Sequence, residues 1–67
     1  MKISFDNTAD ALYFTIDENG KVVTSEEVKP GVIIDLDSKN EVIGIEILNI
    51  KHRIDPSKLK QILVEVA

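Results

Sequence analysis

The 67-residue chain carries 12 acidic and 8 basic side chains, so its formal net charge is −4. This length allows one domain, residues 1–67, and its small core makes stabilisation by a second copy or another protein an expectation. The absence of cysteine excludes a disulfide framework, no apolar run reaches the roughly 18 residues of a membrane span, and the acidic charge disfavours nucleic acid. We therefore expect a cytoplasmic protein without a secretion leader that does not bind membranes.

Five short β-rich runs, separated by turn residues, occupy roughly the first fifty positions. Asn19-Gly20 lies between two of these runs and favours a type I′ hairpin turn, because both residues tolerate a positive φ. Pro30-Gly31 is typical of the centre of a type II turn, and the polar residues 38–41 form a further loop. The pattern predicts a five-stranded antiparallel β-meander, with strands at residues 2–5, 11–16, 21–28, 31–37 and 42–48.

The C-terminal segment changes from strand to helical periodicity. Asp55 is a favourable N-cap residue, and Pro56 suits the first helical position, which needs no N–H donor. We predict a helix from Pro56 to about Val66, within a helical part at residues 55–67, that packs on one face of the sheet. The expected fold is therefore α+β. The apolar stripe of this helix consists of Leu59, Ile62, Leu63 and Val66.

Alternation along the strands predicts which side chains face the helix. Pairing residues 36 with 43, 34 with 45 and 32 with 47 places six apolar side chains on one face of the last two strands. Extending the Asn19-Gly20 hairpin pairs Ile16 with Val23 and Phe14 with Ser25. This register adds further apolar residues to the same face and turns Glu27 toward it.

The opposite face keeps apolar residues that one helix cannot cover. One interpretation is a half-solvated sheet, since folded surfaces are normally rich in apolar atoms. The other is a contact surface for a second copy or a different protein, and an exposed edge strand could serve the same purpose. The residues of this candidate interaction face are Tyr13, Val22, Val28, Ile33 and Val42.

Two acidic groups have the composition of a polar site. Asp6, Asn7 and Asp10 place three oxygen-bearing side chains in one short loop, a composition compatible with Ca²⁺ or Mg²⁺, but Asx residues in tight turns commonly bond their own backbone instead. A second strip, on the outer face of the last two strands, consists of Asp35, Asp37 and Glu46. Two carboxyl groups perform acid–base chemistry when their surroundings separate their pKa values, whereas on an open sheet they mainly solubilise.

The basic residues cluster after the last predicted strand. His52 lies between Lys51 and Arg53, where a solvated connector residue is the simplest interpretation, because no serine has the context of a nucleophile. Together with Lys58 and Lys60, this cluster is the one candidate for phosphate contact, and three adjacent cations in an acidic chain are a weak signal. The sequence contains no Gly-rich phosphate loop, zinc motif or nucleophile elbow, so we predict no catalytic residues, no metal ligands and no cofactor.

Several motifs in order along residues 1 to about 50 resemble the small prokaryotic family known as domain of unknown function 2283. They are Met1–Ile3, Phe5-Asp6, Ala9–Tyr13, Ser25, Glu27-Val28, Pro30–Val32, Asp35, Asp37 and Val42–Leu48. The resemblance implies a short stand-alone protein of bacteria or archaea without an established activity. Some family members are proposed antitoxin-like partners of small basic toxins. The residues it puts at motif positions are Asp6, Asp10, Glu27, Pro30, Gly31, Asp35, Gly44 and Glu46.

Two hypotheses of function follow. The first is a non-enzymatic interaction module that forms a homo-oligomer or binds a protein through its sheet face or an edge strand, as an antitoxin-like partner of a small basic protein would. The second is a domain that binds a small ligand or a divalent metal through Asp6, Asp10, Glu27, Asp35 and Glu46.

Overall fold

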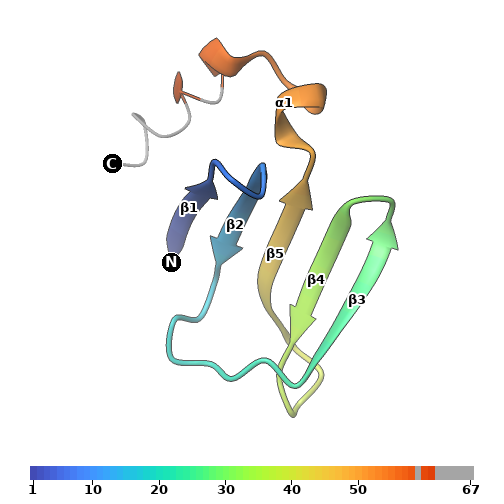
Figure 1. Ribbon diagram of the computed structural model, residues 1–67. Coiled ribbons are helices and arrows are strands. Elements are labelled where there is room, and N and C mark those ends of the chain that lie inside the picture. The colour runs from blue at the N-terminus through green and yellow to red at the C-terminus, as the bar shows by residue number, and fades with distance from the viewer. Residues whose placement is uncertain (59, 62–67) are drawn as a thin grey trace.

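The computed structural model describes residues 1–58, 60 and 61. Its main element is one five-stranded antiparallel sheet, and a short helix follows the last strand (Figure 1). The five predicted strands are confirmed, with small changes at their ends. The elements are β1 Lys2–Asp6, β2 Ala11–Thr15, β3 Thr24–Lys29, β4 Val32–Leu36, β5 Val42–Leu48 and α1 Ile50–Arg53.

The described helical structure is limited to short pieces. α1 is four residues long and lies in the stretch that was expected to be a connector. Residues 56–58, 60 and 61 are also helical, in agreement with the predicted start at Pro56. The apolar stripe of the predicted helix, Leu59, Ile62, Leu63 and Val66, lies outside the described residues. Among the residues that are described, no helix has the length and apolar character needed to cross a membrane.

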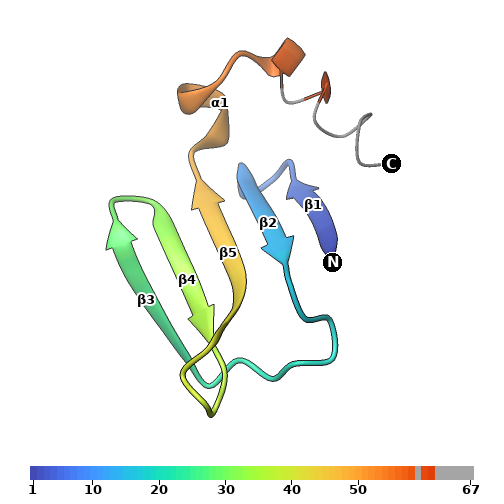
Figure 2. The same cartoon turned by 180° about the vertical axis from the view of Figure 1, so that it is seen from behind.

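The strand order is β1-β2-β5-β4-β3, so the prediction of a meander was wrong (Figure 1). β3, β4 and β5 follow one another as hairpins, and β2 lies beside β5 instead of β3. This is the order of a Greek key, with β1 added at the outer side of β2. Residues 16–23 connect β2 to β3 by crossing the end of the sheet, as the reverse view also shows (Figure 2).

The expected hairpin at Asn19-Gly20 fails because Asp17 forms a different turn. The Asp17 carboxylate accepts the Asn19 backbone N–H at 3.0 Å, and its carbonyl accepts the Gly20 N–H at 3.2 Å. Neither Asn19 nor Gly20 has the positive φ that a type I′ turn requires. The predicted pairs of Ile16 with Val23 and of Phe14 with Ser25 are therefore absent, and Phe14 lies opposite Ile45.

The two later hairpins agree better with the sequence. Gly31 has a φ of +76°, as the Pro30-Gly31 turn predicts. The predicted pairings of residue 32 with 47 and of 34 with 45 are confirmed. Leu36 lies opposite Val42 instead of Ile43, because a bulge between Asp35 and Leu36 shifts the register by one residue.

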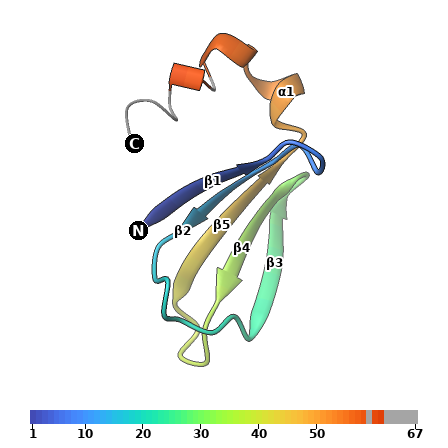
Figure 3. The ribbon, with the colours of Figure 1, turned by 60° about the vertical axis from the view of Figure 1, so that its left-hand side comes forward.

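The core lies where β2 and β5 meet α1. Leu12 and Ile50 are buried at its centre, and both belong to elements that the crossover brings together. Figure 3 shows α1 beyond the end of the sheet at which β5 ends, not across its face. The side chains that pack against Leu12 and Ile50 are only half-buried: Ile3, Phe5, Phe14, Ile47 and Ile54. Within residues 1–58, 60 and 61, the buried hydrophobic side chains are those of Ala11, Leu12, Leu36, Ile43 and Ile50.

Candidate functional site

Three acidic residues of the candidate polar site lie on one face of the sheet. A row of opposite residues crosses it through Tyr13, Glu46, Ile33 and Glu27, and Asp35 lies two residues along β4 from Ile33. Because opposite residues share a face, and so do residues two apart on one strand, Glu27, Asp35 and Glu46 face the same way. The prediction that Glu27 turns toward the apolar face was wrong, since β3 pairs with β4 and not with β2. We call this side of the sheet the outer face.

The Asp35 carboxylate is held by its neighbours on the adjacent strands. The Ser25 hydroxyl donates a hydrogen bond to Asp35 Oδ1 at 2.7 Å. Asp35 Oδ2 leans over Gly44 on β5, where a Cβ atom would come within 3.1 Å of it. The missing side chain at Gly44 therefore provides the room that this carboxylate occupies.

Glu46 lies diagonally across β4 and β5 from Asp35 and has an altered acidity. Partial burial raises the pKa of Glu46, and a hydrogen bond and the charge of Asp35 raise this pKa further. Glu46 therefore keeps its proton up to a higher pH than an isolated glutamate does.

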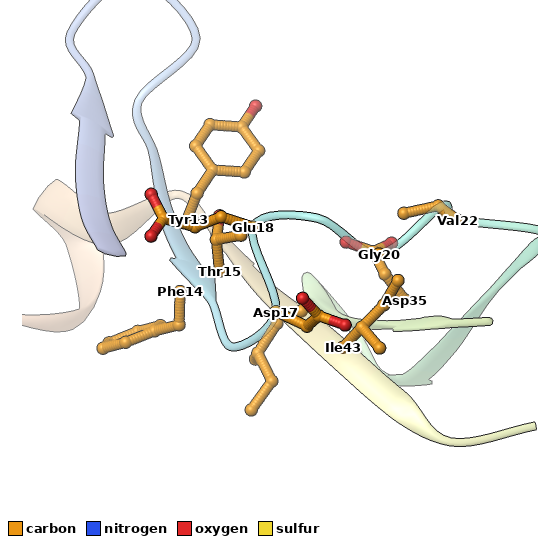
Figure 4. A pocket seen from close by; sticks show the side chains of 11 residues that line it. Tyr13, Phe14, Thr15, Asp17, Glu18, Gly20, Val22, Asp35 and Ile43 are labelled. Atoms are coloured by element: carbon orange, nitrogen blue, oxygen red, sulfur yellow. The ribbon is translucent and has the colours of Figure 1, made fainter. Parts of the chain in front are cut away.

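A pocket of about 110 Å³ lies beside Asp35, between β2, β5 and the crossing segment. Figure 4 shows the Tyr13 ring and Asp35 extending to one side of the sheet, and Phe14 to the other. Pockets for small metabolites normally measure about 300 Å³ or more, so this hollow is too small for one. Its polar and acidic lining residues are Tyr13, Thr15, Asp17, Glu18 and Asp35.

Asp6 and Asp10 are separate from these residues and stabilise backbone turns. Asp6 Oδ1 accepts the backbone N–H groups of Thr8 and Ala9, each at 3.0 Å. Both carboxylate oxygens of Asp10 accept the Lys51 N–H, at 3.2 and 3.4 Å, which ties the β1–β2 turn to α1. Within residues 1–58, 60 and 61, no three histidine or acidic side chains are grouped as metal ligands would be. The five residues of the candidate polar site thus occupy two places, each with a different role.

The residues of the candidate interaction face are distributed over several elements. Tyr13 and Ile33 lie on either side of Glu46 in the outer row and are half-buried. Val28 lies at an irregularity of the edge strand β3, Val22 belongs to the crossing segment, and Val42 begins β5; all three are exposed. Tyr13 and Ile33 form a continuous row with Glu46, whereas the three valines belong to other parts of the fold.

Arg53 has a structural role that the sequence patterns did not indicate. Its Nε donates to the Leu48 carbonyl at 2.8 Å, and its Nη2 donates to the Pro30 carbonyl at 2.6 Å. Lys51 Nζ donates to Asn7 Oδ1 at 2.9 Å, so two of the three clustered cations contact their own chain. His52 is exposed.

Comparison with known proteins gives one positive result. The family model described as "Protein of unknown function (DUF2283)" matches residues 2–51. No curated protein and no solved structure matches the chain. The matched segment contains all five strands and the first two residues of α1, which is most of the described structure. The chain therefore belongs to the family of proteins of unknown function DUF2283.

Proposed function

We propose that this chain is a non-enzymatic protein-interaction module that binds other chains through its sheet. The carrying observation is a row of apolar sheet residues that stays half-buried within the part of the chain that the structure describes. Ile3, Phe14, Ile34 and Ile45 form a continuous row across four strands, yet none of them is buried. Further exposed apolar side chains lie on other parts of the sheet and on the crossing segment: Ile16, Val22, Val23, Val28 and Val42. Contiguous apolar surface of this kind is typical of contact sites.

The charge of the outer face favours a basic partner. Glu27, Asp35 and Glu46 place three carboxyl groups on neighbouring strands, and the whole chain has a formal net charge of −4. Complementary charge increases the rate of encounter and disfavours acidic competitors. An antitoxin-like role, in which this acidic face binds a small basic protein in the cytoplasm of a prokaryote, is the form of the proposal that fits this charge and the family resemblance.

The test is affinity capture from an extract of the native host with matched baits. Glu27→Lys reverses a charge on the outer face, whereas Glu41→Lys makes the same change at an exposed residue of the β4–β5 loop. We expect the wild type and Glu41→Lys to retain one small basic protein that Glu27→Lys loses. Recovery of the bait alone, or equal capture by both variants, would contradict the antitoxin-like proposal.

The alternative hypothesis, a domain for a small ligand or divalent metal, has less support. Asp6 and Asp10 already accept backbone N–H groups, and the hollow beside Asp35 is small. A ligand specific to the folded state must raise the melting temperature. A reproducible rise with millimolar Ca²⁺, Mg²⁺, Mn²⁺ or Zn²⁺ that is lost in Asp35→Asn would favour this alternative over the interaction module.

A further inference from the structure

The two edges of the sheet differ in how well they are protected from pairing with another strand. On β3, a register shift between Glu27 and Lys29 interrupts the ladder, and Pro30 directly follows the strand. Bulges, prolines and charges are the usual features that block an edge strand. The β3 edge is therefore unsuited to accept another strand.

The β1 edge has neither a bulge nor a proline, and its charged side chains, Lys2 and Asp6, lie at its two ends. Its five residues, Lys2–Asp6, pair with β2 without any shift of register, and the segment contains no proline. Within the described sheet, β2 is the sole neighbour of β1. The outer backbone groups of β1 thus form an edge of regular register, and such an edge is a template for an added strand.

The sequence of β1 is complementary to itself when two copies run antiparallel. With a two-fold axis at Ser4, Lys2 of each copy lies opposite Asp6 of the other, and Ile3 lies opposite Phe5. Residues that lie opposite one another share a face, so the apolar faces of the two sheets continue on one side. Moving the register by one residue would place Ile3 opposite Ser4 and turn the two apolar faces to opposite sides.

We propose that a second copy of this chain binds at the β1 edge, antiparallel and centred on Ser4, so that one sheet continues through both copies. This inference rests on the proposed function, because it assigns the sheet contact of the interaction module to one edge. Ile3 and Phe5 are half-buried and already pack against the Leu12–Ile50 centre of the core. In the dimer, Ile3 and Phe5 of the second copy cover the solvent-exposed sides of Phe5 and Ile3 of the first.

Charge reversal tests the register in solution. Lys2→Glu places two acidic pairs across the axis, and Asp6→Lys places two basic pairs there, so each variant should dissociate with a Kd about tenfold or more above that of the wild type. An equimolar mixture restores opposite charges at both positions and should sediment as a heterodimer. Circular dichroism checks the fold of Asp6→Lys, because Asp6 also accepts two backbone N–H groups in its turn.

Cross-linking tests the axis without any change of charge. The chain has no cysteine, so Ser4→Cys introduces a single thiol. Opposite residues of an antiparallel pair have Cα atoms about 4.5–5.5 Å apart, a separation that a disulfide can span. Under mild oxidation Ser4→Cys should form a covalent dimer at low micromolar concentration, whereas Glu27→Cys, at the β3 edge, should remain monomeric on a non-reducing gel.

The outcomes separate this inference from the proposed function. If the charge reversals leave a wild-type-like dimer intact, or if Ser4→Cys and Glu27→Cys cross-link equally, the dimer does not form through β1. Self-association would then remain, but the β1 interface would be overturned. A wild type that sediments as a monomer at high micromolar concentration would overturn the second copy as partner. In that case capture of a basic protein would still support the interaction module.

Discussion

Replacing Gly31 by alanine should remove a large part of the stability of this small domain. Gly31 has a φ of +76°, a conformation that costs an L-residue about 1–2 kcal/mol. The new Cβ would lie 2.6 Å from Arg53 Nη2 and displace it from the Pro30 carbonyl. The end of an arginine side chain moves easily, so the added cost is the lost hydrogen bond, about 1 kcal/mol for this exposed residue. The sum, about 2–3 kcal/mol, is about half of the about 3–5 kcal/mol expected for a core of this size.

Urea denaturation of four proteins tests this reasoning as a double-mutant cycle. Gly31→Ala should cost about 2–3 kcal/mol in the wild type but only about 1–2 kcal/mol in an Arg53→Ala background, where the hydrogen bond is already lost. The melting temperature of the single variant should fall by roughly 8–20 °C. A cost below about 0.5 kcal/mol, or the same cost in both backgrounds, would show that Arg53 does not depend on the glycine.

Three further changes probe the outer face and the turn at α1. Gly44→Ala should destabilise the fold by about 1 kcal/mol in denaturant titrations, because its Cβ would crowd the Asp35 carboxylate, and the loss should disappear in Asp35→Ala; a stabilised single variant would contradict this. Since the pKa of Glu46 is raised in the folded state, the contribution of Glu46 to stability should increase as pH falls from neutral through that pKa and level off below the ordinary glutamate range. Glu46→Gln should lack this gain and be at least as stable as the wild type at neutral pH, and parallel pH profiles of the two proteins would refute the assignment. Asp10→Ala should cost about 2 kcal/mol in thermal unfolding because it loses both the acceptor for the Lys51 N–H and a side chain suited to its φ of 53°, whereas Asp10→Asn should cost less than half as much; equal losses would argue against the side-chain contact.

Structural features that are determined by residues close together in the chain were predicted correctly from the sequence. Pro30-Gly31 predicted its turn because proline presets one φ and glycine permits the positive φ that follows. The alternation of apolar residues predicted most of the β4–β5 register because a slip of one residue would expose every apolar side chain of a strand. The structural reading of Asp6 could also be made locally, since its partners are two and three residues away.

The wrong predictions concern segments whose conformation is determined by contacts with residues far away in the chain. Asn19-Gly20 is a strong hairpin signal in isolation, but Ile16 and Asp17 both donate their N–H groups to the Ile43 carbonyl, which holds the chain against β5. The inward placement of Glu27 followed from that false hairpin. The hydrogen bond from Arg53 to the Pro30 carbonyl was not predicted, because the two residues are 23 positions apart in the chain.

The crossing of residues 16–23 has a consequence for the order of folding. β3, β4 and β5 are joined by short turns and can pair locally, as can β1 and β2. The β2–β5 ladder instead joins Ala11 to Leu48, so a long loop must close before any of its pairs forms. Such non-local pairing is slow, and the Leu12–Ile50 contact depends on it. We therefore expect the centre of the core to be assembled last, when a completed β1–β2 hairpin docks on a preformed three-stranded sheet.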